Sequence, residues 1–167
     1  MRFTPRPMIV GVLALVLTAA IGPARAAGVV ELSFKPVHEL RDAGRDRWDG
    51  ERNLKLIAER FQALAQRLPD GQVLKVEVTD LDLAGEMRPT RNGSEVRVLT
   101  GRADWPSLSL RWSLAAGGRA LAQGDERITD MSYLMMPLRG RDEQALAYEL
   151  RLIDRWFDER VLAAAAR

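Results

Sequence analysis

One amphipathic segment constrains the fold of this chain more than any other feature. Between positions 54 and 68 the apolar residues recur at the spacing of one helical face, at Leu54, Ile57, Ala58, Phe61, Leu64, Ala65 and Leu68. Asp49 is the predicted N-cap, and Pro69-Asp70-Gly71 supplies the turn that ends the helix. Because only one face is apolar, this helix must lie against a flat apolar surface, and a β-sheet is the predicted partner.

Alternating segments on either side of the helix supply that sheet. Residues 30–34 and residues 72–78 alternate apolar with polar side chains, as half-buried strands do. After Thr79 the apolar phase shifts to Leu81 and Leu83, which predicts a bulge near Thr79-Asp80. Gly85 then indicates a turn or a close approach of two backbones.

The middle of the chain predicts further strands joined by short turns. Residues 87–94 are expected to form a loop around Asn92-Gly93, followed by a strand over residues 95–98. A strand over residues 108–114 reaches a hairpin turn at Ala116-Gly117-Gly118 and returns over residues 119–128. Connections this short favour antiparallel pairing.

A second helix closes the chain, from about Asp142 to Leu162. Its predicted core stripe consists of Leu146, Leu150, Ile153, Phe157 and Val161. With one apolar face on each helix, the predicted fold is α+β: a mostly antiparallel sheet of about five strands, with two helices packed on one face.

The first 26 residues have the pattern of a cleaved signal peptide. Arg2 and Arg6 precede an uncharged apolar run from Met8 to Ile21, and Ala24-Arg25-Ala26 matches a cleavage site. The alternative is a membrane anchor, but the run is shorter than the roughly 20 residues a spanning helix needs. We therefore expect a single domain over residues 27–167, located in the periplasm or secreted, with no stable membrane insertion after cleavage.

Charge and cysteine content limit the function classes. Removal of the leader, with its three arginines, lowers the basic count from 25 to 22 against 23 acidic residues. No concentrated basic face is visible, so a nucleic-acid partner is not expected. Cysteine is absent, and His38 is the only histidine. Thiol catalysis is excluded and a zinc site is disfavoured. No phosphate-binding glycine loop or other cofactor motif is present, so no cofactor is predicted.

Three carboxylates near the strand end form the one acidic corner in the sequence. Asp80 and Asp82 share a strand face, and Glu86 follows Gly85. Such a cluster can bind a hard cation such as calcium or supply the acid and base of a hydrolase. The favoured alternative is structural, with these acids accepting backbone hydrogen bonds or pairing with arginines.

Met131, Met135 and Met136 form a soft apolar group near Tyr133. Methionines of this kind fill gaps in cores, and they also form tolerant binding surfaces. The core interpretation is favoured, and exposure would instead make the group a candidate contact for a protein partner.

Several blocks of the chain resemble a bacterial domain-of-unknown-function family, number 3016. The blocks are Thr79 to Glu86, then Gly124 with Asp130-Met131 and Tyr133, and Tyr148-Glu149 followed by Trp156-Phe157; Phe34, Pro36 and Asp42 match more loosely. The chain departs from the family pattern at Pro106-Ser107 and Leu40. The resemblance implies an exported, mostly proteobacterial protein, and it transfers no activity and no catalytic residue.

The candidate binding residues are therefore the acidic corner and the acids and tyrosines of the other blocks: Asp80, Asp82, Glu86, Asp130, Tyr133, Tyr148 and Glu149. The predicted function is a non-enzymatic binding or protein-interaction module of the cell envelope, with a possible envelope protein as partner. The alternative is a carboxylate-dependent hydrolase or a calcium-binding protein that uses Asp80, Asp82 and Glu86.

Overall fold

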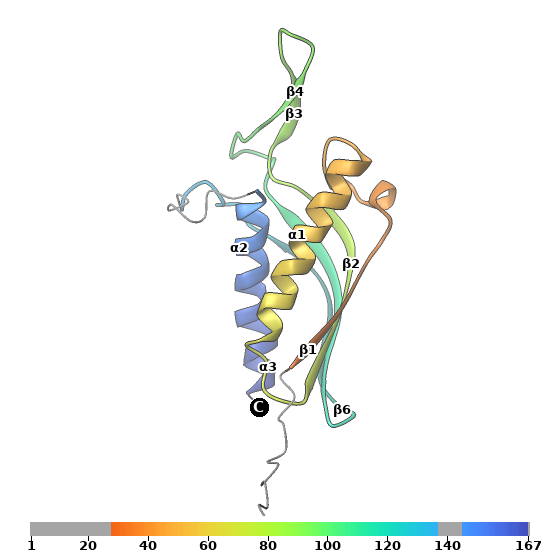
Figure 1. Ribbon diagram of the computed structural model, residues 1–167. Helices are drawn as coiled ribbons and strands as arrows, with labels where there is room; N and C mark the ends of the chain where they lie inside the picture. Colours follow the sequence, from red (N-terminus) through yellow and green to blue (C-terminus); the bar gives the residue numbers. More distant parts are fainter. Residues whose placement is uncertain (1–27, 137–144, 167) are drawn as a thin grey trace, which may run out of the picture.

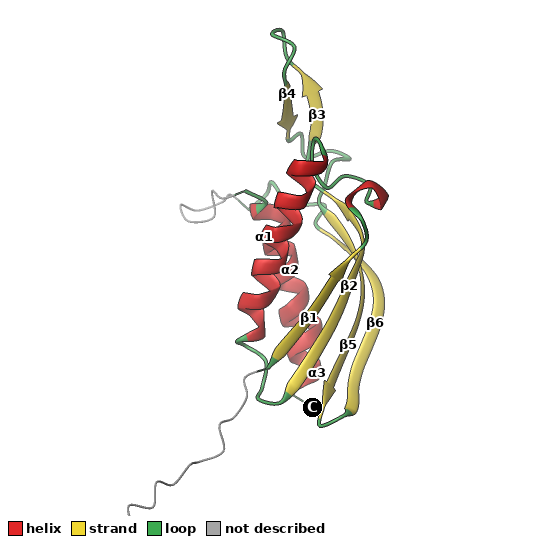
Figure 2. Cartoon of the chain, turned by 45° about the vertical axis from the view of Figure 1, so that its right-hand side comes forward, coloured by secondary structure: helices red, strands yellow, loops and turns green. Residues whose placement is uncertain are grey.

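The protein is an α+β domain in which two helical segments cover one face of a sheet (Figures 1 and 2). The structure is a computed structural model and describes residues 28–136 and 145–166. Its strands are β1 (Val29–Phe34), β2 (Gln72–Asp82), β3 (Glu86–Pro89), β4 (Glu95–Val98), β5 (Ser107–Ala116) and β6 (Arg119–Thr129). Its helices are the short 3-10 turn η1 (Val37–Glu39), α1 (Arg47–Ala65), α2 (Ala147–Trp156), the π-helical segment η3 (Phe157–Leu162) and α3 (Ala163–Ala165).

The main sheet has four strands rather than five, in the order β1-β2-β5-β6. The prediction of a mostly antiparallel sheet holds for β2-β5 and β5-β6, but β1 and β2 are parallel, with Val29 opposite Val73 and Phe34 opposite Val78. The reason lies in the helix between them. Parallel neighbours need a crossover connection, and α1 provides it on the helical face of the sheet.

The N-cap of helix α1 lies three residues before the predicted cap, Asp49. Asp46 is the N-cap, and its side chain accepts a hydrogen bond from the Asp49 backbone N–H at 2.9 Å. Asp49 therefore lies in the first turn, where the helix dipole also favours an acid. The predicted stripe is confirmed, because Ile57 and Phe61 are fully buried beneath the helix.

The end of β2 departs from the sheet as the sequence pattern predicted. The register with β5 shifts between Val78 and Asp80, which is the expected bulge. Gly85 then adopts φ +84°, and a Cβ there would lie 2.7 Å from the Val98 carbonyl oxygen. Both the positive φ and the close approach require glycine.

Residues 86–98 form a separate two-stranded hairpin, which stands off from the body of the domain (Figure 1). The expected loop over residues 87–94 is wrong in its first part, because β3 runs from Glu86–Pro89 and pairs with β4. The predicted turn is shorter and lies around Asn92-Gly93, where Gly93 has φ +81°. Gly85 redirects the chain, so β4 joins β3 and never reaches the main sheet.

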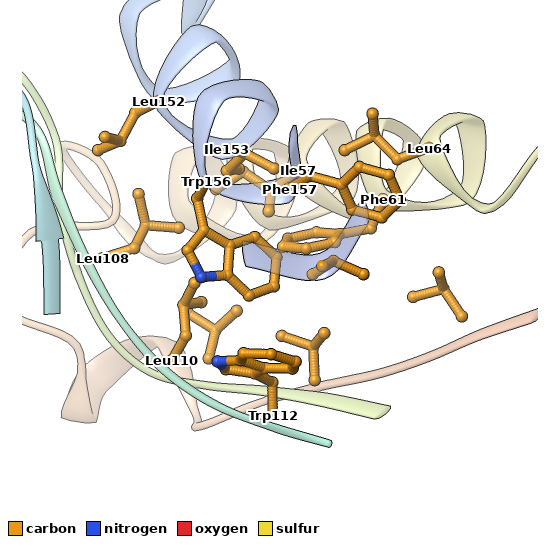
Figure 3. Packing of buried hydrophobic residues seen from close by; sticks show 14 of the residues in the cluster. Ile57, Phe61, Leu64, Leu108, Leu110, Trp112, Leu152, Ile153, Trp156 and Phe157 are labelled. Atoms are coloured by element: carbon orange, nitrogen blue, oxygen red, sulfur yellow. The ribbon is translucent and has the colours of Figure 1, made fainter. Parts of the chain in front are cut away.

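The core lies between the sheet and the helices (Figure 3). Trp156 of α2 occupies its centre, in edge-to-face contact with Trp112 of β5 at 5.7 Å and with Phe61 of α1 at 6.1 Å between ring centroids. Leu150, Ile153, Phe157 and Val161 of the predicted second-helix stripe are buried, while Leu146 is only partly buried. The three aromatic rings join both helices to the sheet.

Glu126 of β6 ties the same region together through polar contacts. Its Oε1 atom accepts hydrogen bonds from the indole N–H groups of Trp112 at 2.8 Å and Trp156 at 3.0 Å. Its other oxygen pairs with Arg160 at 3.1 Å. We call this arrangement the Glu126 clasp. Gly124 makes room beside it, since a Cβ there would lie 2.6 Å from Trp112 Nε1.

The predicted signal peptide, residues 1–26, lies outside the described residues, as does the predicted start of the second helix at Asp142. Within residues 28–136 and 145–166, no helix is both long enough and apolar enough to cross a membrane.

Candidate functional site

Two carboxylates of the predicted acidic corner, Asp80 and Asp82, bind the same arginine, Arg41. Asp80 accepts hydrogen bonds from the backbone N–H groups of Arg41 and Leu81, both at 3.0 Å. Asp82 pairs with the Arg41 guanidinium at 3.3 Å and lies 3.8 Å from that of Arg127. Burial raises the pKa of Asp82, although the charge of Arg41 opposes this shift.

Glu86 shares no hydrogen bond or ion pair with Asp80 or Asp82 in the described part of the chain, but it lines the same hollow of about 470 Å³ as Asp82 and Asp42. It starts the hairpin, is exposed, and pairs with Arg88 at 3.1 Å. No group of three or more His, Asp or Glu side chains in the described part of the chain is arranged to hold a metal ion. Asp80 and Asp82 thus make the kinds of contact expected if these acids are structural, which are ion pairs with arginine and hydrogen bonds from backbone N–H groups.

Asp130, Tyr133 and Tyr148 hold loops together at the hairpin end of the domain. Tyr133 is fully buried, and its hydroxyl accepts a hydrogen bond from the Gly101 backbone N–H at 3.3 Å. Burial raises the pKa of Tyr133 to about 12, and its hydrogen bond to Asp104 acts in the same direction. The rings of Tyr133 and Tyr148 meet edge to face at 4.9 Å.

Arg151 of α2 connects this cluster to the helix. Its guanidinium donates to the Tyr133 carbonyl at 2.6 Å, stacks over the Tyr148 ring at 5.4 Å, and lies 3.6 Å from the buried Asp130 carboxylate. These contacts hold residues 130–133 and Tyr148 against α2, and Asp130, Tyr133 and Tyr148 all take part in packing at this end.

Glu149 is also a buried carboxyl group, but unlike Asp130 it forms no ion pair with an arginine in the described part of the chain. It lies in the first turn of α2 and is 3 % exposed. One oxygen accepts a hydrogen bond from the Ala84 backbone N–H at 2.7 Å, just after β2. Burial raises the pKa of Glu149, and the hydrogen bond from Ala84 and the charge of Arg97 oppose that shift. Such a group in a cleft is a candidate functional residue.

Arg97 of β4 lies beside Glu149 but is already paired. Its two terminal nitrogens donate to the two oxygens of Asp42 at 2.8 and 2.9 Å, which is a bidentate ion pair. Arg97 also donates to the Gly85 carbonyl at 3.0 Å. The pair therefore joins the base of the hairpin to the segment that precedes α1.

Glu149 and Arg97 line a cavity of about 520 Å³, which we call the helix-end pocket. The N-terminal ends of α1 and α2 and the base of the hairpin lie at the same end of the molecule (Figure 1). The other polar lining residues are Asp49, Arg52 and Asn53 of α1 and Tyr148 of α2. Its apolar walls include Leu83, Leu99, Leu146 and Ala147. This size, and apolar walls with a few polar groups, are typical of small-molecule sites.

Leu146, in the pocket wall, has the only positive φ of a non-glycine residue in the described chain, at +61°. This left-handed conformation is unfavourable for a branched apolar side chain, and residues held in it cluster at binding and catalytic sites. The turn places Leu146 at the entrance to α2, immediately before the first helical residue.

A second hollow of about 460 Å³ lies on the open face of the sheet, opposite the helices. Its charged side chains are exposed and pair with one another, Lys75 with Glu31 at 2.9 Å and Arg111 with Glu77 at 2.8 Å. Paired surface charges of this kind form a solvated face. Of these two, the helix-end pocket is thus the better candidate site, because it contains a buried acid.

The methionine group is exposed, so its predicted place in the core is wrong. Met131 is 64 % exposed, Met135 84 % and Met136 59 %. They follow β6 on a loop held by the buried Tyr133, so the tyrosine takes the core position and the methionines face outward. Their exposure makes them a candidate contact for a protein partner.

Sequence reasoning included Glu149 among the candidates but missed most of its pocket. Arg97 and Asp42 are 55 positions apart in the chain, and no spacing rule connects them. The sequence does contain an indication that Glu149 is buried. It lies four positions before Ile153 and seven before Trp156, on the buried stripe of its helix. An acid on a buried stripe indicates a group with a partner or a function.

Comparison with known proteins identifies a family but no activity. A model of the protein family of unknown function DUF3016 matches residues 28–159. The structure of the hypothetical protein CT253 from Chlamydia trachomatis is similar at 16 % sequence identity and a TM-score of 0.34, covering 84 % of this chain and 96 % of that chain. No curated protein matches this chain. The blocks around Asp80, Tyr133 and Glu149 lie inside the matched range, and the chain belongs to the DUF3016 family.

Proposed function

We propose that this protein is an exported, non-enzymatic binding module of the cell envelope, and that it binds a small ligand in the helix-end pocket. The observation that carries the proposal is the buried carboxyl group of Glu149 in the wall of a cavity of about 520 Å³. Burying an acid is unfavourable, and retaining one in a cavity is expected where it recognises a ligand. The signal-peptide pattern of residues 1–26 supports export.

The arrangement of the pocket favours binding over catalysis. Besides Glu149 it has one other carboxylate, Asp49, whose oxygens accept hydrogen bonds from the Arg52 guanidinium and from the Arg45 backbone N–H. An acid held in this way is poorly placed to act as a general base. His38 is exposed and is not among the residues that line the pocket.

An envelope protein is a further proposed partner, with the exposed Met131, Met135 and Met136 as its contact. Flexible, polarisable methionine side chains adapt to varied partner surfaces. This contact and the pocket are separate proposals, and loss of one leaves the other intact.

Nuclear magnetic resonance of the ¹⁵N-labelled chain from residue 27 tests the pocket. Small amphiphiles with cationic, neutral and anionic head groups are titrated in turn. We expect at least one class to shift amide resonances of residues 83–85, 97–99 and 145–149. The absence of shifts there with all three classes at millimolar concentration would refute the pocket as a binding site.

A matched pair of variants places the ligand. Leu99→Trp adds bulk at the pocket rim, where Leu99 is 40 % exposed, and should abolish binding. Leu121→Trp makes the same change at a residue that is 39 % exposed near the start of β6, and it should leave binding unchanged. The turn between β5 and β6 lies at the opposite end of the domain from the hairpin (Figure 1). Export is tested separately by fractionation and by N-terminal sequencing, which should find Ala27 first.

A further inference from the structure

The charges around the helix-end pocket cancel in pairs, with one exception. Arg97 is neutralised by its bidentate contact with Asp42. Arg52 is neutralised by Asp49, three residues earlier on the same helix. Among the lining residues, this leaves Glu149 as the acid without a dedicated cation. An anionic ligand would find both guanidinium groups occupied and would approach an enclosed carboxylate.

Glu149 also has unused capacity to accept hydrogen bonds. An ionised carboxyl group can accept about four. Ala84 N–H supplies one at 2.7 Å, and the residue's own backbone N–H also favours the ionised form. The carboxyl group is therefore positioned by the end of β2 and still able to bind a donor.

The rest of the wall is suited to a hydrocarbon. Leu83 and Ala147 are buried beside Glu149, and the more exposed Leu99 and Leu146 extend the apolar surface. A ligand that satisfies both features has a positively charged donor at one end and an apolar body at the other. Salt bridges formed in such enclosed surroundings are screened less than those on the surface.

We propose that the helix-end pocket binds an amphiphilic organic cation, with its ammonium or guanidinium group on Glu149 and its apolar body against Leu83, Leu99 and Leu146. This inference rests on the proposed binding function and specifies the ligand class. The positive group supplies the cation that Glu149 lacks, and the apolar body covers the surface of Leu99 and Leu146 that is otherwise in contact with water.

Three probes of equal chain length test the ligand class in the wild-type protein: hexylamine, hexanol and hexanoate. Affinity is measured from amide shifts of residues 83–85 and 145–149. We expect hexylamine to bind about tenfold more tightly than hexanol, because it adds a charge-assisted hydrogen bond, and hexanoate to bind most weakly. This comparison needs no variant, so it holds even where a substitution affects folding.

Glu149→Gln then assigns the effect to one side chain. Glutamine can still accept the hydrogen bond from Ala84, so the fold is retained while the charge is lost. Hexylamine affinity should fall about tenfold and hexanol affinity should stay the same. The control is Glu77→Gln on the open face of the sheet, where the side chain pairs with Arg111, and it should change neither affinity.

The outcomes separate the two proposals. Hexanol or hexanoate binding in the pocket as tightly as hexylamine overturns the cation class and leaves the pocket as a binding site. Equal loss of hexylamine and hexanol affinity in Glu149→Gln also overturns it, since the role of Glu149 would then be structural. No pocket shifts with any of the three probes contradicts both proposals.

Discussion

Removing the Glu126 clasp should destabilise the domain more than any change to its exposed charges. Glu126→Ala leaves the indole N–H groups of Trp112 and Trp156 without their acceptor, and these residues are 7 % and 3 % exposed. An unsatisfied buried donor costs about 1–3 kcal/mol. The Glu126 side chain is 21 % exposed, so water can reach part of the space, which favours the lower half of that range.

The expected loss is therefore about 2–4 kcal/mol for the two donors together. Domains of this size unfold with about 5–15 kcal/mol, so the change is a large fraction of the total. It corresponds to a fall in Tm of roughly 10 °C. Urea unfolding followed by tryptophan fluorescence measures it directly, because the two affected side chains are themselves fluorophores.

Two further variants at this strand control the measurement. Glu126→Gln keeps an acceptor but loses the charge and the contact with Arg160, so about 1 kcal/mol should be lost. Asp125→Ala changes the neighbouring residue, which is 68 % exposed and lies 3.4 Å from Arg111, and should stay within about 0.5 kcal/mol of wild type. If Glu126→Ala is as mild as Asp125→Ala, the clasp contributes nothing and the reasoning is wrong.

Three further expectations concern packing and titration. Gly124→Ala places a Cβ 2.6 Å from Trp112 Nε1, so chemical denaturation should show a loss of about 1–3 kcal/mol; an unchanged midpoint would contradict the close contact. Native Glu149 keeps its proton above its ordinary pKa of 4.5, so it favours folding below that pH, and this contribution is lost as the pH rises through its raised pKa. With rising pH the free energy of unfolding should therefore decline less in Glu149→Gln than in the wild type, while Arg97 and Asp42 are unchanged in both. Parallel pH curves for the two proteins would refute this prediction. Tyr133 has a pKa raised to about 12, so stability should fall between the ordinary value of 10.0 and about 12; Tyr133→Phe should lack this step in ultraviolet absorbance and melting experiments.

Local sequence patterns predicted most helices and strands of this fold. The direction of strand pairing and the position of the hairpin depend on contacts between distant residues, which those patterns do not specify. The stripe of α1, the alternation of β1 and the bulge near Asp80 each follow from residues a few positions apart. The parallel register of β1 and β2 does not, since alternation is the same in either direction. The hairpin leaves the sheet because Gly85 turns the backbone and its N–H donates to the Asp104 carbonyl at 2.8 Å, a contact that no local pattern specifies.

Less of the candidate site than of the fold could be predicted, because the site also depends on contacts between distant residues. Glu149 carries a signal in its own helix, as an acid on the buried stripe. Its surroundings do not, because Ala84, Arg97 and Asp42 come from three other segments of the chain. Asp80 and Asp82 looked like a possible site because they are close in sequence, but Arg41, which lies 39 and 41 positions away, binds both.

The parallel pair at the edge of the sheet also determines the order in which this chain can assemble. β5 and β6 meet across Gly117-Gly118, whereas Val29 must find Val73, 44 positions along the chain, with α1 already formed between them. Because closing a longer loop loses more chain entropy, we expect the β5-β6 hairpin to form early and β1 to dock last. Pulsed hydrogen exchange during refolding should protect β6 amides before those of β1. If the export proposed above proceeds from the N-terminus, the strand that we expect to fold last is the first to cross the membrane.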